Sequence, residues 1–335
     1  MASVTDGLAS AANGMKGMRV LILGDMVADI YLDGRISRIS REAPVLVLEE
    51  IGERIVAGGA ANVAHNAATL SGTVSAFGVL GEDVGGAGIT AVLKGAGVDV
   101  SGLIVAADRP TISKTRVIAG GRATVSQQIV RIDKESREPL SPALAEDLEA
   151  QLMRALARVD AVVLSDYGSG TITQRIRERI LSACRECGIL TIVDSRYGVR
   201  SFSGVDFVKQ NDAELSAAFE RHLDTEEALE ETTRALIAEL GAKGALITRG
   251  EKGMMLFLAD GARYEIPVSD KSEVYDVSGA GDTCVAAFIL ALAGGASPLA
   301  AARLSNIASG IAVRKFGTAT VSAAELTRKV RELSV

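Results

Sequence analysis

The sequence predicts an α/β fold in which helices cover both faces of a mainly parallel central sheet, giving three layers. Continuous apolar runs, such as residues 19–24, 160–165 and 189–194, indicate strands buried on both faces, and helical stretches separate them. Two regions, 44–49 and 111–133, contain strand-like segments with no helix between them. These regions predict a second, small sheet that is separate from the central one.

The composition suits a large globular enzyme. The chain has 335 residues, of which 48% are hydrophobic and 23% charged, enough for a substantial core. A net charge of −6 argues against a general nucleic-acid-binding protein, which would carry a basic face. No apolar run is long enough to cross a bilayer, so we expect no membrane association. Three cysteines and the lack of a secretory signal predict reduced thiols and a cytoplasmic location.

The first 17 residues are small and polar and lack a continuous apolar stretch. We expect residues 1–17 to form a disordered leader, with Met18 as an alternative start. The rest of the chain, 18–335, is expected to form a single domain.

The other elements follow in order along the chain. The predicted strands are 19–24, 74–80, 160–165, 189–194, 205–209 and 245–248, and the predicted helices are 59–70, 86–95, 300–313 and 323–333. Ligands of a parallel sheet bind beyond the carboxyl ends of its strands. The candidates at or just after such ends are Asp25, Asp166, Asp194 and Arg249.

The small sheet is predicted from strand-like segments within insertions at about 34–57 and 109–133. The insertions carry an unusual set of cations, namely Arg38, Arg41, Lys114, Arg116 and Arg131. Any one of them alone can be explained as a charged residue on an edge strand, where charge discourages aggregation. Together they suit recognition of an anionic group on a substrate, because arginine binds phosphate through two parallel hydrogen bonds.

Residues 276–283 predict a glycine-rich turn at the start of a buried helix, since an apolar run follows at once. Gly279 and Gly281 lack Cβ atoms, so the backbone there can approach a ligand closely. The free N–H groups and the dipole of a helix start favour anions, phosphate above all. Asp282 would repel such an anion unless it took a proton from a hydroxyl, which is the role we predict. The alternative is an ordinary helix start with an acidic first turn.

A second glycine-rich stretch, 56–67, opens an alanine-rich helical segment. Its glycine pair lets the backbone approach a ligand, and Asn62 can both donate and accept hydrogen bonds. A tightly packed helix is the alternative. Asp25 and Asp29 follow the first strand, where paired carboxylates can accept hydrogen bonds from sugar hydroxyls; a solvated turn is the alternative there.

Two of these stretches resemble signatures of one enzyme family. Residues 276–283, and the block 56–86, resemble the two signatures of the ribokinase-like (PfkB) carbohydrate kinases. The resemblance implies a ribokinase-like fold in which ATP and Mg²⁺ support phosphorylation of a sugar held under a β-sheet lid. It implies Asp282 as the base, with the anion held at Gly279, Ala280 and Gly281. The implied sugar ligands are Asp25, Asp29, Gly58, Gly59, Asn62 and Asp194.

The resemblance also implies a nucleotide site in the second half of the chain. Asn211 and Glu214 match the family's Asn-x-x-Glu pattern, in which the glutamate helps to hold Mg²⁺ through water. A helix N-cap with an acidic first turn is a compatible reading of the same residues. The other implied nucleotide contacts are Thr248, Arg249, Gly250, Gly253 and Asn306. In relatives, carbonyls at the positions of Asp276 and Val277 bind a monovalent cation, so K⁺ is a candidate ligand there.

Three segments narrow the range of substrates that the sequence predicts. Residues 25–31, 37–44 and 274–283 resemble kinases of D-glycero-β-D-manno-heptose 7-phosphate, which phosphorylate the anomeric hydroxyl in the supply of ADP-heptose for lipopolysaccharide. The resemblance implies Arg41, Lys114 and Arg116 as ligands of the distal phosphate. The loop after Asp194 departs from the family pattern, since Ser-Arg-Tyr-Gly replaces Pro-Lys-Gly.

Two further expectations follow, and two rival functions remain. The lid often forms the dimer contact in this family, so a homodimer is expected. The chain has two histidines and lacks a His-x-Gly-His signature of an attached nucleotidyltransferase, so we expect a stand-alone kinase. The rival functions are a PfkB kinase of another sugar phosphate, such as fructose 6-phosphate, and a non-catalytic sugar or nucleotide sensor on the same fold.

Overall fold

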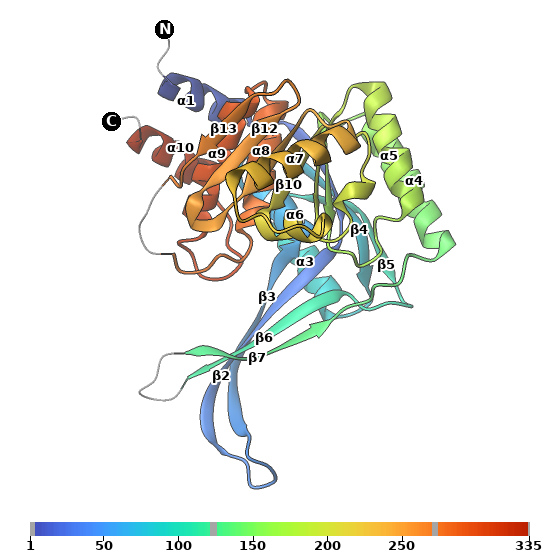
Figure 1. The fold of residues 1–335 in the computed structure, drawn as a ribbon. Helices are drawn as coiled ribbons and strands as arrows, with labels where there is room; N and C mark the ends of the chain where they lie inside the picture. Colours follow the sequence, from blue (N-terminus) through green and yellow to red (C-terminus); the bar gives the residue numbers. More distant parts are fainter. Residues whose placement is uncertain (1–3, 121–125, 270–273, 334–335) are drawn as a thin grey trace.

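A nine-stranded sheet forms the centre of the fold, in the order β13-β12-β11-β10-β9-β8-β1-β4-β5 (Figure 1). The structure, a computed structural model, describes residues 4–120, 126–269 and 274–333. The strands are β1 (Arg19–Gly24), β4 (Thr73–Gly81), β5 (Asp99–Ala106), β8 (Ala161–Asp166), β9 (Leu190–Ser195), β10 (Phe207–Asn211), β11 (Gly244–Thr248), β12 (Met254–Leu258) and β13 (Arg263–Ile266). Neighbouring strands are parallel except where β12 pairs with β11 and β13.

Helices cover both faces of this sheet, because successive side chains of each buried strand point to opposite faces. In β1, Val20 and Ile22 join one core, whereas Leu21 and Leu23 join the other. The first core is covered by α1 (Val4–Gly14), α2 (Ala60–Thr69), α3 (Val84–Gly95), α8 (Ala280–Ala293), α9 (Pro298–Ala312) and α10 (Ala323–Glu332). The second is covered by α4 (Pro142–Leu156), α5 (Gln174–Cys187), α6 (Asp212–Ala218) and α7 (Glu226–Leu240). The predicted three-layer arrangement is confirmed.

The predicted small sheet is also present, with four strands in the order β3-β2-β6-β7. Its strands are β2 (Met26–Ile39), β3 (Leu46–Gly59), β6 (Ile112–Gly120) and β7 (Gln127–Lys134). It projects from the body as a long twisted ribbon (Figure 1). Strand β2 starts at Met26, earlier than the predicted insertion at 34, so the small sheet begins immediately beside the central one. Part of the second predicted insertion, 121–125, lies outside the described residues.

Helix α1 overturns the expectation that residues 1–17 form a disordered leader. Leu8, Ala11, Ala12 and Met15 recur at helical spacing, and Ala11 and Met15 are buried against the first core. The helix contacts α8, α9 and α10. A helix this short is unstable alone, so its own composition does not reveal it; packing on three other helices supplies the stability. Residues 1–3 lie outside the described part of the chain.

The strand order of the central sheet fixes where a ligand can bind. Strand β1 lies between β8 and β4, and the strand order reverses between β1 and β8. The loops that follow β1 and β8 therefore run in opposite directions at the carboxyl ends of these strands and leave a crevice between them. Gly24 allows β1 to approach β8, since a Cβ there would clash with the carbonyl oxygen of Ser165. Of the helices that the structure describes, none combines the length and the apolar character needed to span a membrane.

Candidate active site

A cavity of about 390 Å³ lies beyond the carboxyl ends of β8, β9 and β10, against the start of α8. Asp194, Asn211, Glu214 and Asp282 are among the residues that line it. They come from three separate parts of the sequence, at 194, 211–214 and 282, and all four are among the predicted site residues. The position agrees with the rule that ligands of parallel sheets bind beyond the carboxyl ends of the strands.

Two glycines shape the start of α8, and the backbone itself requires glycine at Gly279. Gly279 is the N-cap, with a φ of 78°, and a Cβ there would lie 2.5 Å from Asn62 Nδ2. A Cβ at Gly281 would lie 2.8 Å from Lys209 Nζ. The N–H of Ala280 is directed to the carbonyl oxygen of Val277, at 3.3 Å, so this N–H closes the turn. The N–H groups of Gly281 and Asp282 belong to the first turn of the helix, which suits an anion.

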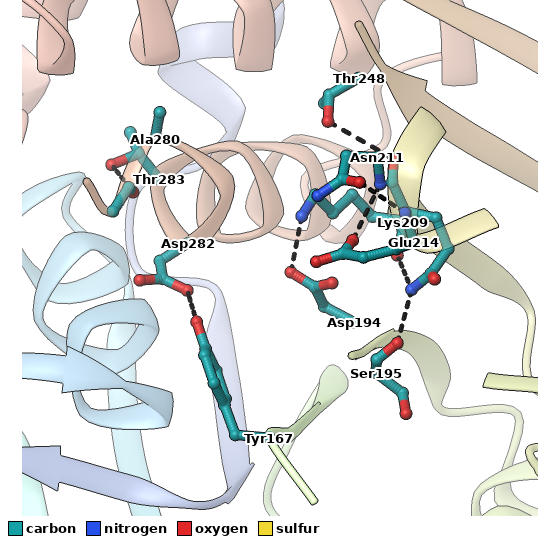
Figure 2. Close-up of polar contacts among 12 residues, drawn as sticks. Tyr167, Asp194, Ser195, Lys209, Asn211, Glu214, Thr248, Ala280, Asp282 and Thr283 are labelled. Atoms are coloured by element: carbon teal, nitrogen blue, oxygen red, sulfur yellow. Dashed lines mark hydrogen bonds and ion pairs between the residues drawn. The ribbon is translucent and has the colours of Figure 1, made fainter. Parts of the chain in front are cut away.

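Asp282 is buried at the first turn of α8 and is held by two donors. Asn62 Nδ2 donates to its Oδ2 at 2.8 Å, and the Tyr167 hydroxyl donates to its Oδ1 at 3.0 Å. Figure 2 shows Tyr167 and Asp282 pointing toward one another. Burial raises the pKa of Asp282 to about 7, against the opposing effect of the hydrogen bond from Asn62. A carboxylate with a pKa near 7 suits a general base.

Tyr167 is a site residue that the sequence reasoning missed. It stands one position beyond Asp166, at the end of β8, so the strand-end argument could have included it. Its ring lies 5.4 Å from Lys114 Nζ, measured to the ring centroid, and Lys114 comes from β6 of the small sheet. Tyr167 therefore connects the small sheet to Asp282.

The geometry of Asp25 contradicts the prediction that it contacts a sugar. Its side chain is fully buried, and both carboxylate oxygens accept backbone hydrogen bonds. The donors are the N–H groups of Tyr167, Ser169 and Thr171, at 2.8, 3.1 and 3.3 Å. Asp25 therefore anchors the loop after β8 and positions Tyr167, rather than facing the cavity.

Asp29 lies farther along β2 and is paired with one of the predicted cations. Arg116 Nη1 donates to its Oδ1 at 2.7 Å, and the Thr318 hydroxyl donates to its Oδ2 at 3.2 Å. Gly58 leaves room for this carboxylate, since a Cβ there would lie 2.7 Å from Asp29 Oδ2. Gly59 has a φ of 54° and caps α2, which brings Asn62 to Asp282.

Arg41 is not brought to the cavity of its own chain. It is exposed and belongs to the turn between β2 and β3, residues 40–45. That turn lies at the far end of the long hairpin, away from the central sheet (Figure 1). The prediction that Arg41 binds the distal phosphate is therefore wrong for a single chain, because each strand of the hairpin has 14 residues and carries the turn outward.

On the other side of the cavity, Asn211 and Glu214 form a capping box at the start of α6. The Glu214 N–H donates to Asn211 Oδ1 at 2.7 Å, and the Asn211 N–H donates to Glu214 Oε2 at 2.9 Å (Figure 2). The alternative reading as a helix cap is therefore confirmed, and it keeps Glu214 at the cavity wall.

The residues around Glu214 suit Mg²⁺ better than a metal ion that needs all its ligands from protein side chains. Among the residues that the structure describes, no group of three or more His, Cys, Asp or Glu side chains could hold a metal ion. Mg²⁺ keeps several waters and takes oxygen ligands from substrate phosphates, so a single carboxylate such as Glu214 can be enough.

The remaining predicted nucleotide residues do not line this cavity. The Thr248 hydroxyl contacts the carbonyl oxygen of Gln210 at 3.4 Å, and Arg249 Nη1 lies 3.7 Å from Glu226 Oε1. Asn306 Nδ2 donates to the carbonyl oxygen of Pro267 at 2.7 Å. Two glycines shape the neighbouring turn, Gly250 with a φ of 54° and Gly253 with a φ of 81°.

The predicted cation position adjoins the start of α8. The Asp276 side chain accepts hydrogen bonds from the N–H groups of Ser278 and Gly317, at 2.9 and 3.0 Å. The Val277 carbonyl oxygen accepts the N–H of Ala280. Asp276 thus ties the loop before α8 to residues 314–321, and the K⁺ assignment stays a prediction.

A pH dependence follows from the burial of Asp282. Its pKa is raised to about 7, and only the ionised form can accept a proton, so activity is expected to rise with pH and to level off above about 7. The measurement is kcat/KM of the wild-type protein from about pH 5.5 to 9, with the pH stability of the fold followed in parallel. A rate that is flat across pH 7 while the protein stays folded would contradict the assignment of Asp282 as the base.

Comparison with known proteins agrees with this geometry. The pfkB family of carbohydrate kinases matches residues 18–325. The chain is 40% identical over 316 residues to the bifunctional protein HldE of Geotalea uraniireducens (strain Rf4), covering 93% of this chain and 63% of that protein. It is 40% identical over 314 residues to the bifunctional protein HldE of Gluconobacter oxydans (strain 621H), covering 93% and 64%. The chain therefore spans slightly less than two thirds of the length of these relatives.

Solved structures share the fold at low sequence identity. Ribokinase from Arabidopsis thaliana, solved with ribose and ATP, matches with a TM-score of 0.73 and 22% identity, covering 94% of this chain and 99% of that one. Phosphofructokinase-2 from Escherichia coli, solved with potassium, matches with a TM-score of 0.75 and 21% identity, covering 96% and 100%. The fold is thus ribokinase-like. Because the family match covers nearly the whole described domain, this chain belongs to the pfkB family of carbohydrate kinases, phosphotransferases that act on sugar hydroxyls.

Proposed function

We propose that this kinase transfers the γ-phosphoryl group of ATP to the anomeric hydroxyl of D-glycero-β-D-manno-heptose 7-phosphate, giving the 1,7-bisphosphate for ADP-heptose and lipopolysaccharide synthesis. The observation that carries the kinase chemistry is the buried Asp282 carboxylate at the start of α8, on the wall of the cavity. The choice of heptose rests on the resemblance of residues 25–31, 37–44 and 274–283 to heptose 7-phosphate kinases. The free cysteines 184, 187 and 284 suit a cytoplasmic enzyme.

In the proposed reaction, Asp282 takes the proton of the attacking hydroxyl. Asn62 and Tyr167 hold its two oxygens, so the carboxylate stays oriented toward the cavity. The N–H groups of Gly281 and Asp282 hold oxygens of the transferring group. Glu214 is the residue that we assign to Mg²⁺, through water, and bound Mg²⁺ would neutralise charge on the phosphates. K⁺ near Asp276 and Val277 is a further candidate that the same assay can test.

At the sugar end, we propose that the small sheet acts as the lid. Lys114 and Arg116 are separated by one residue on β6, so their side chains start from the same face of the strand. Arg116 is already bound to Asp29 and Lys114 lies beside Tyr167, so both cations stand near the predicted sugar position. A phosphate on the sugar would accept charge-assisted hydrogen bonds from them, and lid closure would exclude water.

The test is a panel of acceptors with ADP release as the readout. Heptose 7-phosphate is expected to exceed the same heptose without its phosphate by about a hundredfold in kcat/KM, because charge-assisted hydrogen bonds are lost. Omitting Mg²⁺, or replacing K⁺ by Na⁺, tests the cation assignments in the same assay. Preference for fructose 6-phosphate would favour the rival sugar kinase. ATP binding without ADP release for any sugar would favour the sensor.

We also propose a homodimer that forms through the lid sheet. Ile39, Ile51 and Ile132, from β2, β3 and β7, are 67%, 64% and 58% exposed, and a stable interface would bury such side chains. Ile132→Glu is expected to give a monomer in sedimentation velocity at micromolar concentration, whereas the wild type sediments as a dimer. Val84→Glu is the matched control, because Val84 is 70% exposed but lies on α3. A monomeric wild type, or a dimeric Ile132→Glu variant, would count against this interface.

A further inference from the structure

Lys209 is a buried cation at the cavity that the proposed mechanism has not used. It lies on β10 and is 5% exposed, and its Nζ donates to Asp194 Oδ2 at 2.9 Å (Figure 2). A lysine ammonium has three N–H donors, so the hydrogen bond to Asp194 uses one of them. Lysine is seldom buried to this degree unless it is paired or has a ligand.

The position of Lys209 beside α8 brings its ammonium to the anion-binding turn. Phe207 and Lys209 are two residues apart on β10, so their side chains lie on the same face of the sheet. Phe207 packs edge-on against Phe288 of α8, with ring centroids 5.4 Å apart. Lys209 reaches the start of the same helix, where a Cβ on Gly281 would lie 2.8 Å from its Nζ. The ammonium and the first-turn N–H groups thus face the same cavity.

The carboxyl groups around the cavity make a cation at this place electrostatically favourable. Asp166, Asp194, Glu214 and Asp282 all line it, and the lining cations are Lys209 and Arg196. Burial alone lowers the pKa of Lys209, but the charges of Asp194 and Glu214 outweigh this effect, and the pKa lies above its ordinary value. The lysine therefore stays protonated, and a phosphoryl group entering among these carboxylates meets a positive charge.

We propose that Lys209 is a catalytic residue whose ammonium contacts the γ-phosphoryl group of ATP at the start of α8 and stabilises its charge during transfer, with Asp194 as the positioning residue. This assignment rests on the proposed function. In the step, the sugar oxygen forms a bond to the γ-phosphorus, the bond from that phosphorus to the β–γ bridging oxygen breaks, and ADP leaves. The proton of the hydroxyl goes to Asp282, and Lys209 keeps its protons throughout.

The alternative is that Lys209 is only half of a structural ion pair, and the variants are chosen to separate the two. Lys209→Met alone would leave Asp194 buried without its partner, so loss of folding is expected there. The informative variant is Lys209→Met combined with Asp194→Asn, in which both charges are removed. Asp194→Asn alone is the matched reference, because it keeps the ammonium. The asparagine oxygen can still accept its hydrogen bond, and Asp166, Glu214 and Asp282 still line the same cavity, so this variant is expected to fold. Thermal unfolding of both proteins checks that they are folded before their activities are compared.

Two readouts then test the contact. Relative to Asp194→Asn, the double variant is expected to lose about a hundredfold or more in kcat, with KM for the sugar nearly unchanged. Calorimetry with Mg²⁺ and no sugar compares ADP with the non-hydrolysable β,γ-imido analogue of ATP. The double variant is expected to lose about tenfold or more of its affinity for the imido analogue, while its affinity for ADP stays the same.

The outcomes separate this inference from the proposed function. If the wild type phosphorylates no sugar but the preference for the imido analogue depends on Lys209, the phosphate contact stands and the proposed reaction fails. If the wild type is an active heptose 7-phosphate kinase and the double variant matches Asp194→Asn in both readouts, the inference is overturned and the lysine is structural.

Discussion

Replacing Asp282 by asparagine is expected to lower kcat by about two to four orders of magnitude, the usual range for loss of a general base. Asparagine has nearly the same shape, and its amide can keep hydrogen bonds with Asn62 and Tyr167, which now hold the two carboxylate oxygens. The variant therefore removes the proposed base and little else. The measurement is ADP release with the preferred sugar under saturating ATP.

The controls for this variant are nucleotide affinity and stability. Affinity for the imido analogue of ATP should change little. Because burial raises the pKa of Asp282 to about 7, ionising it opposes folding; this cost grows as pH rises from about 4 to about 7 and then stays constant. At pH 8 the neutral asparagine should therefore give a melting temperature at least equal to that of the wild type. Near-normal turnover of this variant would remove Asp282 as the base.

Replacing Gly279 by alanine is expected to lower kcat by about a hundredfold to a thousandfold, the usual cost of disturbing an anion hole. The new Cβ would lie 2.5 Å from Asn62 Nδ2 and 2.9 Å from Thr318 Cγ2. Asn62 must then move, and it is the residue that donates to Asp282. Gly279 also has a φ of 78°, where alanine costs about 1–2 kcal/mol.

Gly295→Ala is the matched control for this second prediction. Gly295 follows the other end of α8 and has a φ of 85°, and a Cβ added there would meet no heavy atom within 4 Å among the described residues. It should reproduce the backbone cost in a thermal unfolding measurement while leaving kcat nearly unchanged. Equal turnover in the two variants would mean that contact with Asn62 does not matter for catalysis.

Local patterns predicted most of the secondary structure. The continuous apolar run 19–24 forms β1, and the alanine-rich segment 59–70 contains α2. Both could be predicted because the composition of each segment by itself indicates its type, a strand buried on both faces or a helix of small residues. The glycine pattern of 276–283 likewise predicted the start of α8, since only glycine tolerates a φ of 78° beside Asn62.

Local patterns did not predict α1 or the role of Asp25. The residues of α1 are mostly small, and the helix is stable through its contacts with α8, α9 and α10. Asp25 and Asp29 both follow β1, and nothing in their spacing tells them apart. In the fold, one carboxylate anchors the loop of Tyr167, whereas the other binds Arg116.

The sequence and the tertiary structure each determined a different part of the candidate active site. The sequence by itself determined that an acidic residue stands in the glycine-rich first turn of a buried helix, because glycine spacing and an apolar helix are local properties of residues 276–292. Only the tertiary structure decided that Tyr167 and Lys209 join it and that Arg41 does not. The reason is that strand order and hairpin length set these distances, and both depend on which strands pair rather than on any short stretch of sequence.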